Sequence, residues 1–148
     1  MEFEFKEVRF YNPYMAPFDE KGKITERVES GLENVLAAYS YIAPIHASKT
    51  DNNPRNYLIS QVYIVGSGAH NEAESDLDFM LLTPNLDSAS AINFTLFLQL
   101  LFFSNRSKTQ AIDPYVRKED MFPGRERIEI TDQVKELLSK YNDKIVKT

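Results

Sequence analysis

The sequence predicts one α/β or α+β domain, in which helices pack on a small mixed sheet. Residues 24–44 carry apolar side chains at helical spacing, and residues 58–65 and 77–82 are runs of β-forming residues. A second helical segment follows over residues 88–104. Because these elements alternate within 148 residues, about the length of one domain, we expect a single domain over residues 1–148.

The first third of the chain predicts a strand, a loop and a helix. Residues 3–10 alternate apolar and charged side chains in two short registers, which indicates a strand with a bulge. Two prolines favour a loop over residues 12–22. The amphipathic helix that follows should end near Pro44, and Arg27 falls outside its apolar stripe. That stripe contains Ile24, Val28, Leu32, Val35, Leu36 and Tyr39.

Two predicted strands and a short loop occupy the middle of the chain. Residues 49–56 are a polar linker, after which residues 58–65 form the first of these strands. Residues 77–82 form the second, and Pro84 terminates it. The loop over residues 66–75 therefore joins two adjacent strands.

The helix predicted at 88–104 is apolar over nearly its whole circumference, so it must be buried on more than one side. The core of the same chain or a second subunit in a homo-oligomer could cover it. Residues 110–116 predict a strand that Pro114 confines to an edge or to an irregular pairing, and residues 127–130 predict a short strand. A helix over 131–146 completes the chain, with Thr131 or Asp132 as its N-cap.

Composition excludes several classes of site. The net charge of −5 disfavours a long nucleic acid as partner, because such binding depends on Lys and Arg. The absence of cysteine excludes disulfides, thiolate metal sites and cysteine nucleophiles. The longest apolar stretch, residues 94–103, is much shorter than the roughly 20 residues that span a bilayer. The first residues lack the pattern of a secretory signal, so we expect a cytoplasmic protein.

The loop between the two middle strands and the strand after it carry the candidate site. Gly66-Ser67-Gly68 follows a strand, and glycine allows a tight turn whose backbone amides approach a phosphate, to which Ser67 adds a hydroxyl. Asp76 and Asp78 are two apart, so both carboxylates point to one face of the strand. A hard divalent cation, Mg²⁺ in particular, would relieve their repulsion. The alternative is that both features are ordinary turn and surface chemistry.

The segment from Val65-Gly66-Ser67 to Ser75-Asp76-Leu77-Asp78-Phe79-Met80-Leu81 resembles the signature of the DNA polymerase beta-like nucleotidyltransferase superfamily, especially its minimal members. The resemblance implies that superfamily's fold and a single nucleotidyltransferase domain. It also implies triphosphate binding by Gly66 and Ser67. Asp76 and Asp78 would bind two Mg²⁺ ions, with Mn²⁺ as a substitute.

The resemblance further implies a third carboxylate on a later strand, which binds one metal and takes the proton from the attacking hydroxyl. Asp113 suits the family's order and is preferred, and Glu129 is the alternative. The loop departs from the family's pattern, because it is short and has Gly68-Ala69-His70 where arginines are common. His70 could contact phosphate, or be an exposed loop residue without a role. Arg106, Lys108, Arg117 and Lys118 could neutralise the triphosphate.

The expected function is transfer of a nucleoside monophosphate from a nucleoside triphosphate, with ATP as the expected donor, to a hydroxyl acceptor with release of pyrophosphate. One alternative is a nucleotide-binding or antitoxin-like interaction module of the same fold without turnover. Another is a carboxylate-metal hydrolase. The resemblance also implies a HEPN-type protein partner in a toxin–antitoxin role.

Overall fold

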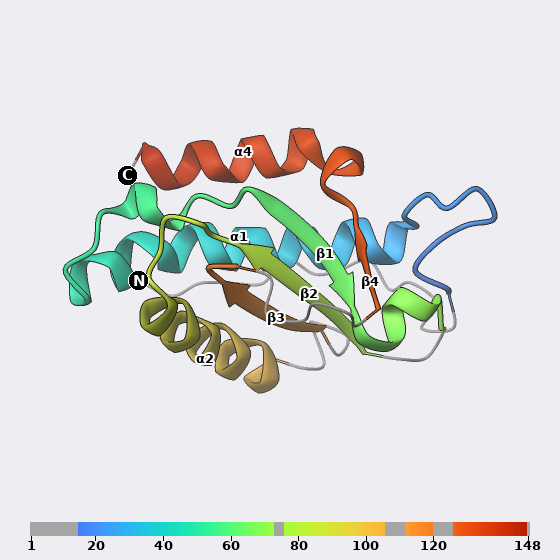
Figure 1. Ribbon diagram of the computed structural model, residues 1–148, viewed down its shortest axis with the longest axis horizontal. Helices are drawn as coiled ribbons and strands as arrows, with labels where there is room; N and C mark the ends of the chain where they lie inside the picture. The colour runs from blue at the N-terminus through green and yellow to red at the C-terminus, as the bar shows by residue number, and fades with distance from the viewer. Residues whose placement is uncertain (1–14, 73–75, 106–111, 120–125, 148) are drawn as a thin grey trace.

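The computed structural model of the chain describes residues 15–72, 76–105, 112–119 and 126–147. These residues form a four-stranded mixed sheet with three α-helices (Figure 1). The strand order is β3-β2-β1-β4. β2 pairs antiparallel with β1 and parallel with β3, and β4 pairs antiparallel with β1. The strands are β1 (Gln61–Val65), β2 (Leu77–Leu82), β3 (Ile112–Arg117) and β4 (Arg127–Glu129). The predicted mixed sheet with packed helices is thus confirmed.

The helices are α1 (Glu26–Lys49), α2 (Ser88–Ser104) and α4 (Lys135–Val146). In Figure 1, α1 runs behind the sheet, α4 lies along its upper side and α2 along its lower side, next to β3. The main core joins all three helices to the sheet face that carries Ile64, Phe79 and Leu81. The opposite face carries a smaller cluster of Val65, Met80 and Leu82, and with it the candidate site.

The prediction that the first helix ends near Pro44 is wrong, because α1 continues through this proline to Lys49. Proline removes one backbone hydrogen bond, but tertiary contacts hold the last turns in place. His46 is buried there: its Nδ1 lies 2.6 Å from the Tyr57 hydroxyl and its Nε2 lies 2.7 Å from Oδ1 of Asn93. The histidine therefore ties the end of α1 to α2 and to the short 3₁₀ helix Pro54–Tyr57.

β1 begins three residues later than predicted. Asn142 of α4 accepts a hydrogen bond from the Ile59 N–H at 3.0 Å and donates one to the Ile59 carbonyl at 2.9 Å. The Asn142 side chain thus makes the backbone hydrogen bonds at Ile59 that a neighbouring strand would otherwise make, and the strand pairing of β1 begins only at Gln61. Pro114 lies in β3, an outer strand of the sheet that the described residues form, as predicted.

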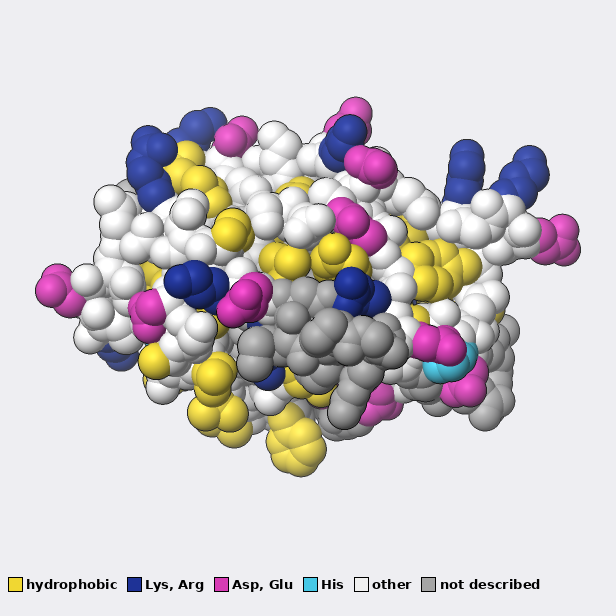
Figure 2. All heavy atoms as spheres, in the orientation of Figure 1, with side chains coloured by type: hydrophobic (Ala, Val, Ile, Leu, Met, Phe, Trp, Pro, Cys, Tyr) yellow, Lys and Arg dark blue, Asp and Glu magenta, His cyan; other side chains and the backbone are white. Residues whose placement is uncertain are grey.

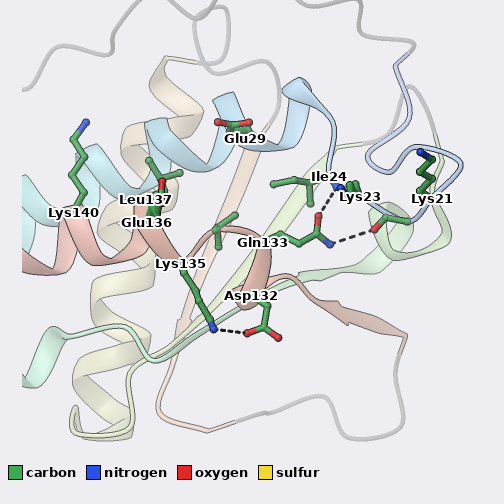
Figure 3. Close-up of a pocket in the computed structure, with 12 residues that line it drawn as sticks. Lys21, Lys23, Ile24, Glu29, Asp132, Gln133, Lys135, Glu136, Leu137 and Lys140 are labelled. Carbon is green, nitrogen blue, oxygen red and sulfur yellow. Dashed lines mark hydrogen bonds and ion pairs between the residues drawn. The ribbon is translucent and has the colours of Figure 1, made fainter.

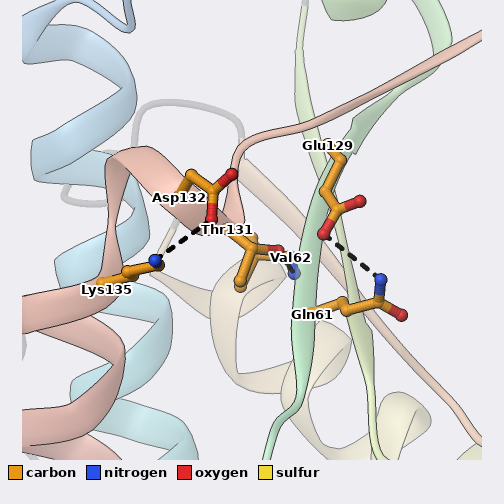
Figure 4. Close-up of polar contacts among 6 residues, drawn as sticks. All are labelled: Gln61, Val62, Glu129, Thr131, Asp132 and Lys135. Atoms are coloured by element: carbon orange, nitrogen blue, oxygen red, sulfur yellow. Dashed lines mark hydrogen bonds and ion pairs between the residues drawn. The ribbon is translucent and has the colours of Figure 1, made fainter.

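The predicted N-cap of the last helix is also wrong, as Figure 4 shows. The Thr131 hydroxyl accepts a hydrogen bond from the Val62 N–H at 3.0 Å, and Asp132 pairs with Lys135 at 3.5 Å. A 3₁₀ turn, Thr131–Gln133, therefore precedes α4, and Val134 occupies the cap position without a side-chain hydrogen bond. The Thr131 hydroxyl thus bonds a backbone N–H of β1 and is not used as the N-cap of α4.

The segment before α1 docks on the start of α4 through Gln133 (Figure 3). The Ile24 N–H donates to Gln133 Oε1 at 2.8 Å, and Gln133 Nε2 donates to the Gly22 carbonyl at 3.3 Å. A cleft of about 1040 Å³ lies here, lined by lysines and acidic residues of both segments. None of the candidate site residues lines it. The strand predicted over residues 3–10 lies outside the described residues.

α2 buries only one of its faces. Ala91, Phe94, Thr95, Leu98 and Phe102 are buried, whereas five other large apolar residues of this helix are exposed. Among the described residues, the core therefore covers this helix on one side only, and burial on further sides by the core, one of the two predicted alternatives, is not found there. In the part of the chain that the structure describes, no helix has both the length and the apolar character needed to cross a membrane.

Candidate functional site

Asp78 and Asp113 lie side by side on neighbouring strands. Asp78 is the second residue of β2 and Asp113 the second of β3, and the parallel register pairs them directly. Paired residues on adjacent strands point to the same face, with the strands about 4.8 Å apart. Asp76, two residues before Asp78, ends the loop that leads into β2. The structure therefore brings together the three carboxylates that the sequence singles out, at one end of β2 and β3.

The neighbouring carboxylates affect the pKa of Asp78. Burial, the neighbouring charges of Asp113 and Asp76, and a hydrogen bond to Asp113 together raise the pKa of Asp78 from 3.8 to about 7. In its neutral form the Asp78 carboxyl donates that hydrogen bond. Its Oδ1 atom is buried and has no hydrogen-bond partner within the described part of the chain. A buried carboxylate oxygen without a partner is energetically unfavourable, so the site is incomplete as a purely structural arrangement.

Gly66 places the turn after β1 against Asp78. Its φ of +70° lies in the left-handed region, and a Cβ atom at this position would lie 2.9 Å from Asp78 Oδ2. Val65, the residue before it, pairs with Asp78 across β1 and β2. Ser67 belongs to the same 3₁₀ turn, Gly66–His70. The phosphate-binding candidates and the carboxylates therefore belong to one site.

Arg27 is a residue near the site that the sequence did not indicate. It lies in the first turn of α1 and is buried, and its Nη1 donates to the Met15 carbonyl at 3.0 Å. Burial lowers the pKa of its guanidinium, and the negative charge of Asp76 opposes this shift. Arg27 and Gly31 are one helical turn apart, and the face they share lies against the sheet. In the sequence, Arg27 has no feature that separates it from the charged surface residues Glu26 and Glu29 of the same helix.

Tyr115 and Arg117 extend the same face of β3 beyond Asp113. Burial and the charges of Asp78, Asp113 and Asp76 raise the pKa of the Tyr115 phenol. The Arg117 guanidinium lies 5.6 Å from the Tyr115 ring centre and donates through Nη1 to Thr95 Oγ1 at 3.0 Å and to the Val116 carbonyl at 2.8 Å. These bonds direct Arg117 toward α2. Arg106 and Lys108 lie outside the described residues, and Lys118 is exposed.

Glu129, the alternative third carboxylate, lies elsewhere on the sheet. β1 separates β4 from β2, so Glu129 and Asp78 are at least about 10 Å apart at the backbone. Its Oε2 accepts a hydrogen bond from Gln61 at 3.2 Å (Figure 4), and the Tyr63 hydroxyl donates to Oε1 at 3.4 Å. His70 is exposed and pairs with Glu126 at 2.7 Å. Of the two alternatives, only Asp113 is next to Asp78.

The chemistry of these donors fits a hard divalent cation. Carboxylate oxygens are the ligands that Mg²⁺ prefers, and Asp78 contributes an oxygen that bonds none of the described residues. As they stand, the described residues contain no group of three acidic or imidazole side chains already arranged to hold a metal ion. Carboxyl groups that share a proton direct their oxygens at each other, and a bound cation would replace that proton.

The chain matches no protein-family model, and comparisons with curated proteins and with solved structures give no match. The interpretation of the site therefore depends on its own geometry and on the motif that the sequence carries.

Asp78→Asn should stabilise the metal-free protein above neutral pH. Between the unfolded pKa near 3.8 and the folded pKa near 7, the folded state binds more protons than the unfolded state. Unfolding free energy therefore falls as pH rises through this window. Asparagine keeps a donor and removes the charge, so its advantage should grow from near zero at pH 4 to about 1–2 kcal/mol at pH 8. This is well below the roughly 4 kcal/mol of a fully buried site, because water reaches the carboxylate.

Chemical denaturation at a series of pH values, in a chelating buffer, measures this difference. Glu129→Gln, which removes a carboxylate from an exposed position, is the matched control and should show no comparable gain. If the gain in unfolding free energy of Asp78→Asn stays constant from pH 4 to pH 8, then ionisation of Asp78 is not the cause of the lost stability.

Proposed function

We propose that this chain is a metal-dependent nucleotidyltransferase with a polymerase beta-like fold. It would transfer a nucleoside monophosphate from a nucleoside triphosphate, ATP first among the candidates, to a hydroxyl acceptor and release pyrophosphate. The observation that carries the proposal is the direct pairing of Asp78 with Asp113 beside Gly66, because a turn suited to phosphate and a set of carboxylates suited to cations then share one site. The mixed order of the sheet and the motif itself support it.

Each residue has a role that follows from its position. Asp76, Asp78 and Asp113 would hold two divalent cations, which when bound supply positive charge to the triphosphate, the attacking oxygen and the leaving pyrophosphate. Asp113 would accept the proton of the acceptor hydroxyl, since the register of β2 and β3 places it directly beside Asp78. Burial, together with the neighbouring charges of Asp113 and Asp76, raises the pKa of Asp78 to about 7, so proton release from Asp78 would accompany metal binding at neutral pH.

The turn after β1 would hold the phosphates. The left-handed Gly66 lets the backbone bend at the end of the strand, and the Gly66–His70 turn follows directly. Arg27 would contribute positive charge near Asp76. The arginines that are common in the loop of the family that the motif resembles are absent here, so this buried arginine is a candidate substitute for their charge.

The test is a transfer assay with purified protein, Mg²⁺ and each of the four nucleoside triphosphates labelled at the α-phosphate. Acceptors should include the chain itself, RNA, small alcohols and, as the resemblance suggests, a HEPN-type protein. Transfer of the label with stoichiometric pyrophosphate release, lost in Asp78→Asn and kept in the surface control Asp132→Asn, supports the proposal. Nucleotide binding without pyrophosphate release would indicate the interaction module, and water as the only acceptor a hydrolase; either result overturns it.

A further inference from the structure

The outer face of α2 is a continuous apolar stripe. Figure 2 shows large hydrophobic side chains protruding at the lower left, where Figure 1 places α2. Successive residues are four, one, three and three positions apart, so at about 100° per residue they lie on one side of the helix. They are Ile92 (47% exposed), Leu96 (59%), Phe97 (51%), Leu100 (65%) and Phe103 (67%). We refer to these five residues as the α2 stripe.

The α2 stripe is unusual because no charge interrupts it. The sequence from Ser88 to Asn105 contains no Lys, Arg, Asp or Glu. Surface helices normally carry charged residues on the side that faces water, and apolar patches of several large side chains mark interaction sites. The inner side of the same helix already fills the core through Phe94, Leu98 and Phe102. The stripe thus lies on the side of α2 that faces away from the main core.

We propose that the α2 stripe binds the α2 stripe of a second copy of this chain, around a two-fold axis near Leu98. The stripe is nearly symmetric about that residue, since Leu96 and Leu100 flank it by two positions each and Ile92 and Phe103 by five or six. Two antiparallel copies would thus place Leu96 against Leu100 of the partner subunit, and Ile92 against Phe103 of the partner subunit. A two-fold interface requires this self-complementarity.

Charge and area both favour a second copy over a different partner. A wholly uncharged stripe offers no salt bridges to select an acidic or basic surface, and the chain itself carries a surface of matching length and character. The five side chains offer roughly 500–600 Å² per copy, since a large side chain carries about 150–250 Å². The pair would bury about 1,000–1,200 Å², near the lower bound for a specific interface, so a reversible dimer is expected.

The α2 stripe and the candidate site consist of different residues. None of the carboxylates of the site belongs to the α2 stripe, and Thr95, on the inner side of the helix, bonds the β3 backbone at Val116. This inference does not depend on the proposed nucleotidyl transfer, because its tests measure mass and cross-linking only.

The first test is sedimentation equilibrium of the purified chain over roughly a hundredfold range of concentration. The unchanged chain should approach twice its 17.1 kDa mass at the upper end. The double variant Leu96→Glu/Leu100→Glu should raise the dissociation constant at least tenfold, because charges would face charges across the axis. Ile128→Glu, an exposed apolar residue on β4, should leave the constant unchanged. A monomer at every concentration, or a dimer that the double variant leaves intact, would overturn the proposal.

The second test uses the absence of native cysteine. Phe97→Cys, next to the axis, should form a disulfide-linked dimer under mild oxidation. Ile92→Cys mixed with Phe103→Cys should link to each other more than either links to itself. Parallel or unrelated packing would reverse that preference and contradict the antiparallel arrangement. Stoichiometric binding of a different protein to the stripe of a monomeric chain would also contradict it.

Discussion

Asp113→Asn should abolish nucleotidyl transfer, whereas Glu129→Gln should leave its rate within about twofold of the unchanged chain. Asp113 is paired with Asp78 in the sheet, so its loss removes both a cation ligand and the proton acceptor. General-base catalysis alone contributes about 10²–10⁴-fold, and a lost ligand adds to this. Glu129 is on the far side of β1 and bonds Gln61 and Tyr63. Initial rates of pyrophosphate release at saturating triphosphate measure both effects.

The two substitutions are matched, because each removes one negative charge from a strand of the same sheet. Thermal unfolding should show both variants folded, so that a lost rate reports chemistry. An Asp113→Asn rate that stays within about twofold of the unchanged chain would exclude Asp113 as the third carboxylate. A Glu129→Gln rate that falls as far as that of Asp113→Asn would require a rearranged sheet.

Gly66→Ala should reduce transfer at least a hundredfold and also destabilise the fold. A side chain at φ +70° costs about 1–2 kcal/mol, and here its Cβ would lie 2.9 Å from Asp78 Oδ2. Either the turn or the carboxylate must move, and a displacement of about 1 Å at a reacting centre can cost 10²-fold in rate. Denaturant titration and the transfer assay, performed on the same preparation, separate the two consequences.

Gly22→Ala provides the control for backbone strain. Gly22 has φ +77°, but a Cβ there would meet nothing within 4 Å. This variant should lose comparable stability from strain and keep its transfer rate. If Gly22→Ala and Gly66→Ala lose activity to the same degree, the close approach of Gly66 to Asp78 has no functional meaning.

Local pattern predicted most of the elements, and tertiary contacts account for the differences. Spacings of three and four identified the apolar stripe of α1 from Val28 to Tyr39. The end of the helix was misplaced at Pro44, because the contacts of buried His46 that hold the last turns are not visible in the local sequence. The Thr131 hydroxyl looked available as a cap because the competing Val62 N–H is 69 residues away. Contacts at that separation leave no periodic signal in a sequence.

Most residues of the candidate site could be predicted from the sequence, but the strand pairing that brings them together could not. The positions of Gly66, Asp76 and Asp78 follow from one short motif, since they lie within 13 residues of sequence. Asp113 and Glu129 both lie between apolar neighbours in strand-like runs, so the sequence pattern alone gives little reason to prefer one of them as the third carboxylate. Strand order distinguishes them, because β3 is next to β2 and β4 is not. Arg27 was missed because a buried arginine on a helix looks like any charged surface residue.

The parallel pairing of β2 with β3 also sets the order in which the site can assemble. β1 and β2 form a hairpin, so Gly66 and Asp78 meet after a short loop closes. Asp78 and Asp113 are 35 residues apart, and α2 lies in the connection between their strands. Loop-closure entropy grows with loop length, and contacts distant in sequence slow folding. We therefore expect the carboxylate pair to form after the β1–β2 hairpin, at the stage when β3 joins the sheet.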